Sequence, residues 1–134
     1  MAKETILLVE DNNDDIVIFR RILKKANIAN PLTVLNDGKQ AIDYLSGAGR
    51  YSDRALHPLP FLVFLDIKLP CVDGFELLHW IRTRPELVGL IVVLLTSSDE
   101  DRDRRQANEL AVRHYLLKPP KAEQIIDLLK SLKP

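Results

Sequence analysis

Short apolar runs alternate along the chain with longer amphipathic segments. Four runs are clear, at 5–9, 61–65, 90–95 and 115–117, and a weaker one lies at 31–35. Their apolar residues are consecutive and do not alternate with polar ones, which is typical of strands buried on both faces of a parallel sheet. The runs therefore predict five strands.

The segments between the runs repeat apolar residues every three or four positions, which is the spacing of one helix face. The segment 99–110 is also expected to be helical, because its acidic residues come first and its arginines follow, in agreement with the helix dipole. Since it has few apolar residues, we expect it to be the most loosely held helix. The other four apolar stripes consist of Ile16, Phe19, Ile22, Leu23 and Ala26; Ala41, Ile42 and Leu45; Phe75, Leu78 and Ile81; and Ile125, Leu128, Leu129 and Leu132.

Strand and helix thus alternate five times, which predicts the α/β class with one doubly wound (βα)5 domain over residues 1–134. Right-handed crossovers leave the flavodoxin-like parallel sheet of strand order 2-1-3-4-5 as the leading arrangement. Residues 46–60 form the one long irregular stretch, and their glycines and prolines predict a loop. A loop of this length is either functional or a tolerated insertion.

The charge balance argues against several classes of partner. Nineteen basic residues match nineteen acidic residues, so no overall field favours nucleic acid or an anionic membrane. No apolar run approaches the roughly 20 residues of a membrane span. The first residues lead directly into a strand-like run, with no sign of a signal peptide. The single cysteine, Cys71, fits a reducing compartment. We therefore expect a cytoplasmic protein.

Chemically active residues lie at the ends of four predicted strands. Glu10 and Asp11 end the first strand, Asp66 the third and Thr96 the fourth, and Lys118 follows the fifth. In an open parallel sheet these carboxyl ends share one edge, where ligands bind. Three carboxylates at one edge repel one another and need a cation, and oxygen ligands select a hard ion such as Mg²⁺. No His or Cys stands at metal-ligand spacing in this cluster, which argues against zinc.

The same edge suits a phosphoryl group. The ammonium of Lys118 and the hydroxyl of Thr96 provide positive charge and a donor beside the metal, which is the electrostatic arrangement that phosphoryl transfer requires. A carboxylate next to a metal can act as a nucleophile, and Asp66 is the natural candidate. The sequence therefore predicts aspartyl-phosphate chemistry at Asp66.

Four motifs resemble the receiver domain of bacterial response regulators: VEDN at 9–12, FLDIKLPCVDG at 64–74, LLTSS at 94–98 and YLLKPP at 115–120. Their order and spacing agree with that family over essentially the whole chain. The long loop before the third strand further resembles the small regulators that are paired with bacterial phytochromes. The resemblance implies a stand-alone two-component response regulator that receives its phosphoryl group from a sensor histidine kinase. It implies a signalling domain with slow autodephosphorylation, and not an enzyme.

The resemblance also assigns roles to the acidic residues. Asp66 is the phosphoacceptor. Asp11 and Asp66 bind Mg²⁺ together with the backbone carbonyl of Lys68, and Glu10 assists, largely through water. Because the side chain of Lys68 stands next to the point where water must approach, we expect it to affect the lifetime of the acyl phosphate.

The remaining roles concern the switch. The resemblance implies that Lys118 contacts the phosphoryl group and that its peptide bond to Pro119 is cis. Thr96 moves toward a phosphoryl oxygen, and Tyr115 turns inward into the space that this leaves. Gly74 permits the tight turn that opens the third helix.

Three alternatives stay open. A phosphatase that works through an aspartyl phosphate needs a second aspartate two residues after the nucleophile, where this chain has Lys68. A receiver-like module that only binds partners would not need the chemical residues, all of which are present. Flavin or nucleotide binding on the same fold lacks its glycine-rich pattern after the first strand.

The position of the last predicted helix suggests how the protein would pass its signal to partners. The chain ends soon after that helix, so we expect no output domain. The signal would then pass to a downstream protein or a phosphotransfer partner, or through a homodimer formed by the face built on the fifth strand. No nucleic acid or membrane partner is expected.

Overall fold

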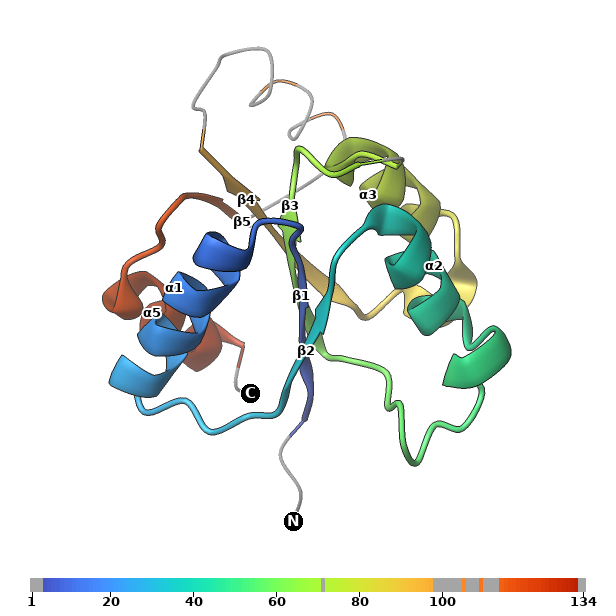
Figure 1. The fold of residues 1–134 in the computed structure, drawn as a ribbon, viewed down its shortest axis with the longest axis horizontal. Helices are drawn as coiled ribbons and strands as arrows, with labels where there is room; N and C mark the ends of the chain where they lie inside the picture. The colour runs from blue at the N-terminus through green and yellow to red at the C-terminus, as the bar shows by residue number, and fades with distance from the viewer. Residues whose placement is uncertain (1–3, 71, 98–104, 106–108, 110–113, 133–134) are drawn as a thin grey trace.

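The protein contains one parallel sheet with helices on both faces (Figure 1). The computed structural model describes residues 4–70, 72–97, 105, 109 and 114–132. The sheet has the strand order β2-β1-β3-β4-β5, and every neighbouring pair is parallel, which confirms the predicted order. The strands are β1 (Ile6–Val9), β2 (Leu32–Leu35), β3 (Leu62–Asp66), β4 (Ile91–Thr96) and β5 (His114–Leu117).

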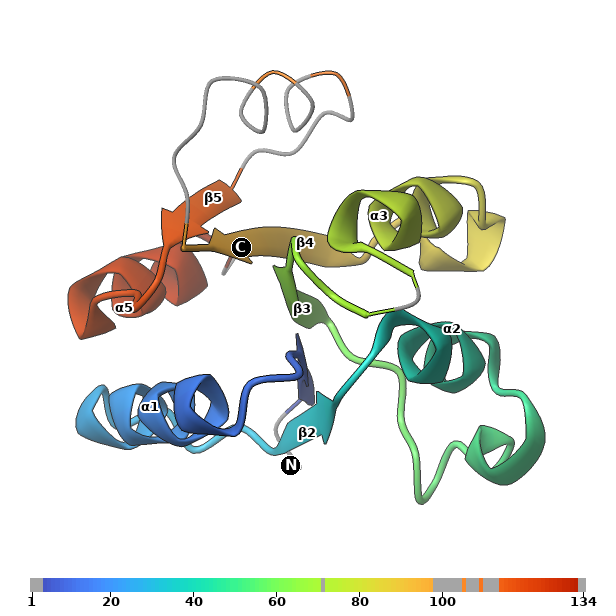
Figure 2. The same cartoon turned by 45° about the horizontal axis from the view of Figure 1, so that its top comes forward.

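Helices α1 (Asn13–Lys25) and α5 (Ala122–Ser131) cover one face of the sheet, and α2 (Gly38–Ser46) and α3 (Gly74–Arg82) cover the other (Figure 2). Within the predicted helix 99–110, only Arg105 and Glu109 are described, and both are helical. The expectation that this helix is loosely held concerns residues outside the described ones. In the described part of the chain, no helix combines the length and apolar character that crossing a membrane requires.

Each face of the sheet has its own apolar core, because successive strand residues point to opposite faces. In β1, Leu7 and Val9 join the core under α2 and α3, whereas Ile6 and Leu8 join the core under α1 and α5. Burial on both faces explains why the strands have unbroken apolar runs. The predicted helix stripes supply the opposite walls, through Ala41, Leu45, Phe75, Leu78 and Ile81 on one side and Phe19, Leu23, Ile125 and Leu128 on the other.

The loop before β3 is more ordered than its composition predicted. It includes a 3-10 turn (Gly49–Tyr51) and is fixed to the end of α2 by Arg54. The guanidinium of Arg54 donates to the carbonyl oxygens of Tyr44 (2.7 Å) and Leu45 (3.0 Å), which lie in the last turn of α2. Carbonyls in the last turn lack N–H donors from a following turn, so Arg54 acts as a cap beside the Gly47 N–H, which also donates to the Tyr44 carbonyl. The loop therefore packs as a fixed part of the fold.

Gly74 stands where α3 begins, directly against the end of β3. A Cβ atom at this position would lie 2.4 Å from the carbonyl oxygen of Asp66 and 2.6 Å from the Cα of Ile67. Gly74 does not have a positive φ angle. The residue is thus needed because two backbone segments approach closely where the third helix opens.

Replacing Gly74 by alanine should therefore destabilise the protein, because backbone atoms have to move to admit the methyl group. We expect a loss of about 3 kcal/mol, the upper range for overpacking, and a Tm lower by about 10 °C in thermal unfolding followed by circular dichroism. Gly89→Ala is the matched control, since nothing lies within 4 Å of its added Cβ. Equal Tm values for the two variants would contradict the role assigned to Gly74.

Candidate functional site

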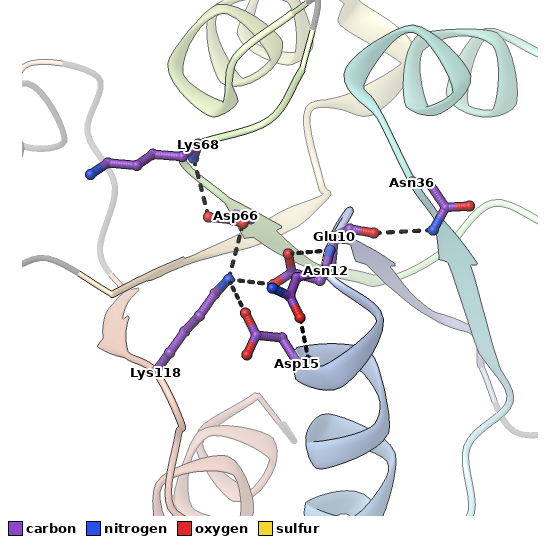
Figure 3. Close-up of polar contacts among 7 residues, drawn as sticks. All are labelled: Glu10, Asn12, Asp15, Asn36, Asp66, Lys68 and Lys118. Carbon is purple, nitrogen blue, oxygen red and sulfur yellow. Dashed lines mark hydrogen bonds and ion pairs between the residues drawn. The ribbon is translucent and has the colours of Figure 1, made fainter.

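Three of the predicted site residues, Glu10, Asp66 and Lys118, meet at the carboxyl edge of the sheet (Figure 3). Carboxylate oxygens of Glu10, Asp11 and Asp66 lie within 4.8 Å of one another. Glu10 and Asp66 are buried, with exposed fractions of 1% and 6%, whereas Asp11 is exposed to solvent. The Nζ atom of Lys118 lies among these carboxylates. The convergence expected from the strand ends is therefore present.

The register of the strands explains why these residues meet. Val9 pairs with Leu65 across β1 and β3, so the next residues, Glu10 and Asp66, stand at the same level of neighbouring strands. On the other side, Thr96 of β4 pairs with Leu117 of β5, and the Lys118 N–H donates to the Thr96 carbonyl at 2.7 Å. Side chains from four strand ends are thus brought to one level of the sheet.

Lys118 is the centre of the polar network. Its ammonium donates to Glu10 Oε1, to Asp66 Oδ2 at 3.0 Å and to Asp15 Oδ2 at 3.1 Å. Only 13% of its side chain is exposed. The peptide bond between Lys118 and Pro119 is cis, as the resemblance implied. Each N–H of the ammonium therefore has one carboxylate acceptor.

Burial has opposite electrostatic consequences for the two partners. Burial, together with the neighbouring Asp66, raises the pKa of Glu10 to about 7, although the Lys118 ammonium favours its charged form. Burial alone would lower the pKa of Lys118, but its hydrogen bonds to Glu10 and Asp66 outweigh this and raise that pKa above its usual value. These hydrogen bonds thus stabilise the ammonium form of Lys118. Even so, Glu10, Asp11, Asp15 and Asp66 together supply four carboxylates against one ammonium, so a further cation would be attracted.

Asp66 is held in place by two donors. Its Oδ2 atom accepts from Lys118, and its Oδ1 atom accepts from the backbone N–H of Lys68 at 3.1 Å. The side chain of Lys68 extends away from the cluster in Figure 3 and is exposed. The carboxylate is therefore oriented by fixed groups at the edge of the sheet, beside the other acidic residues.

Of the two predicted switch residues, Thr96 lies at this edge, whereas Tyr115 lies two residues before the end of β5 and pairs with Leu94. Thr96 ends β4 with 1% of its surface exposed. Tyr115, in β5, is half-buried and packs against the core under α2 and α3. The structure shows one arrangement of the pair, so their switching role remains a prediction, as does the metal-binding role of the Lys68 carbonyl.

The sequence interpretation assigned no role to two residues at the start of the first helix, Asn12 and Asp15. Asp15 contacts Lys118 from the first turn of α1. Asn12 caps that helix, because its side chain accepts from the Asp15 N–H at 3.0 Å while its own N–H donates to Glu10 Oε2 at 3.2 Å. The signal was available, since a helix that starts directly after Glu10 and Asp11 must place its first turn at the same edge.

Most of the chain is similar to proteins of one family. The family model of the response regulator receiver domain matches residues 6–130. This chain belongs to that family. As a response regulator receiver domain, it is a signalling domain and not an enzyme in the usual sense. The family and the fold that the sequence motifs indicated are both confirmed.

Individual relatives come from different organisms. The probable methanogenesis regulatory protein FilR2 of Methanothrix harundinacea is 38% identical over 131 residues, which cover 96% of this chain and 80% of the relative. Response regulator Rcp1 of Synechocystis sp. is 34% identical over 129 residues, covering 96% and 86%.

Two solved structures of response regulators have the same fold. The bacteriophytochrome response regulator AtBRR superposes with a TM-score of 0.87 at 38% identity, and the match covers 98% of this chain and 94% of AtBRR. The crystal structure of the Mn²⁺-bound form of Rcp1 has a TM-score of 0.78 at 34% identity, covering 96% and 91%.

Proposed function

We propose that this response regulator accepts a phosphoryl group on Asp66 from a sensor histidine kinase in a Mg²⁺-dependent reaction. The observation that carries the proposal is the position of Asp66, a buried carboxylate that contacts Lys118 and shares an acidic cluster with Glu10 and Asp11. Membership of the receiver family supports the same reading, because receivers of two-component systems pair with histidine kinases.

The acidic cluster fits a hard divalent cation. Glu10, Asp11 and Asp66 offer only oxygen ligands, which suit Mg²⁺ or Mn²⁺. These residues would hold the ion, together with the backbone carbonyl of Lys68. Rcp1 has been crystallised with Mn²⁺, which supports this assignment. When bound, the metal supplies positive charge for the oxygens of the transferred group.

In the proposed reaction a carboxylate oxygen of Asp66 attacks the phosphorus atom of the phosphohistidine. The P–N bond breaks, its electron pair returns to the imidazole nitrogen, and an acyl phosphate forms on Asp66. The Lys118 ammonium and the Thr96 hydroxyl stand at the same edge and donate to phosphoryl oxygens, which stabilises the charge that develops there. Slow autodephosphorylation is the attack of water on the same phosphorus atom.

The phosphorylated form would signal by a shift between two conformations, with Thr96 and Tyr115 as the switch residues. The signal would pass to a downstream protein or phosphotransfer partner, or through a homodimer formed by the β5 face. The likeness to AtBRR supports a kinase of the phytochrome type. We place the reaction in the cytoplasm, where Mg²⁺ and kinase phosphodonor domains are both available.

The proposal predicts that a small phosphoramidate donor will label the purified protein in the presence of Mg²⁺. Intact-protein mass spectrometry should show one added phosphoryl group, and EDTA should prevent its addition. Hydroxylamine should release the label, because it cleaves acyl phosphates and leaves phosphoesters intact. A protein that stays unlabelled at saturating donor and Mg²⁺ would instead be a receiver-like binding module, and the proposal would be wrong.

A further inference from the structure

One carboxylate at Lys118 lies outside the acidic cluster that suits a metal. Asp15 Oδ2 accepts from the ammonium at 3.1 Å, yet Asp15 does not belong to the group formed by Glu10, Asp11 and Asp66. Its side chain is 36% exposed and comes from the first turn of α1, whereas the three cluster residues follow the ends of strands. Asp15 therefore reaches the ammonium from a separate element (Figure 3).

The position of Asp15 is fixed by the start of its helix. Its backbone N–H donates to the Asn12 side chain at 3.0 Å, and the Asn12 N–H donates to Glu10 Oε2 at 3.2 Å. The first turn of α1 is thus tied to the buried Glu10 side chain by two consecutive hydrogen bonds. A carboxylate on this turn offers a stable acceptor for a long, flexible lysine side chain.

A bound divalent ion changes the balance around the ammonium. Glu10 and Asp66 would then share their negative charge with the metal, so their attraction for Lys118 falls, while Asp15 keeps its full charge. An ammonium has three N–H donors. The bond to Asp15 uses one of them and leaves the others for phosphoryl oxygens on Asp66.

We propose that Asp15 is a positioning residue for phosphoryl transfer. It holds the Lys118 ammonium on the α1 side of Asp66 while the metal occupies the strand-end carboxylates, so that the free N–H groups face the phosphoryl group. The inference rests on the proposed phosphorylation of Asp66 and adds a residue that acts through Lys118. Asp15 itself does not touch the reacting atoms.

The test compares Asp15→Asn with Asp14→Asn. Asp14 is an exposed carboxylate in the same helix turn, and the described ion pairs of Lys118 do not include it. Both variants remove one charge from the start of α1, so effects on the helix dipole match. At saturating Mg²⁺, Asp15→Asn should slow labelling by phosphoramidate about fivefold, equivalent to about 1 kcal/mol. Asp14→Asn should stay within about twofold of the wild type.

A second measurement does not depend on the rate of phosphoryl transfer. Beryllofluoride mimics an acyl phosphate, and its affinity in the presence of Mg²⁺ can be measured by fluorine NMR. Asp15→Asn should weaken this binding by a similar factor. In a Lys118→Met background, Asp15→Asn should have no further effect on labelling, because the two residues act through one contact.

The outcomes separate the two proposals. If the wild type is labelled but Asp15→Asn behaves like Asp14→Asn in both measurements, the positioning role is wrong and the phosphoacceptor assignment stands. An additional slowing in the Lys118→Met background would also exclude action through that lysine. A wild-type protein that takes no label and binds no beryllofluoride overturns the proposed function and this inference together.

Discussion

The Asp66→Asn variant should take no phosphoryl group from phosphoramidate or from a histidine kinase. An amide nitrogen and a neutral amide oxygen are poor nucleophiles, so the loss should be complete within detection, at least about a thousandfold. In the wild type the Lys68 N–H and the Lys118 ammonium donate to different oxygens of Asp66, so the single amide oxygen can keep only one of these two bonds. Intact-protein mass spectrometry after prolonged incubation with donor and Mg²⁺ measures the effect directly.

The fold of this variant should remain intact. Asp66 raises the pKa of Glu10 by its charge, so the neutral amide relieves a repulsion between two buried groups. We therefore expect a Tm without Mg²⁺ that equals or exceeds the wild-type value. Asp43→Asn on α2 makes the same chemical change away from the site and should be labelled normally. Persistent labelling of Asp66→Asn would show that another residue is the acceptor.

The second large effect should come from Lys118→Met, which keeps much of the apolar length of the side chain and removes its charge. Loss of one preorganised donor to the transition state typically costs about a hundredfold or more in rate, and we expect labelling to slow by at least that factor. The rate should be measured at saturating Mg²⁺, so that any change in metal affinity does not contribute.

The same substitution should affect stability in a metal-dependent way. Without Lys118, the buried carboxylates of Glu10 and Asp66 have lost their cation, which costs about 3 kcal/mol when one partner of a buried pair is removed. Added Mg²⁺ should restore much of the lost Tm, because it binds the folded state. Lys39→Met, at an exposed position on α2, is the control and should change neither quantity. A Lys118→Met protein as stable as this control without Mg²⁺ would contradict the role of the ammonium.

The strand-end residues could be predicted because sheet register decides their positions. The inferred parallel order put Glu10 and Asp66 at one edge, and the observed pairing of Val9 with Leu65 places them at the same level. Local apolar pattern was enough for this inference. The partnership between Lys118 and these acids followed from the same rule.

Contacts that depend on the placement of helices and loops were harder to predict. Asp15 reaches Lys118 because α1 packs beside α5, and the sequence pattern of either helix alone does not reveal this. The need for Gly74 arises from the distance between two backbone segments, which composition does not encode. Arg54 anchors the loop by donating to backbone carbonyl groups. Every residue has such a carbonyl, so the residue types in the sequence do not identify these partners.

The position of Lys118 also affects how the occupancy of the metal site would depend on the concentration of Mg²⁺. The ammonium of Lys118 neutralises part of the acidic cluster. Because this group is covalently attached to the chain, its effective concentration at the cluster does not depend on the salt in solution. A divalent ion therefore has to compete with the Lys118 ammonium for the carboxylates. We therefore expect rapid exchange and modest affinity, so that the protein would be ready to react only where magnesium is abundant.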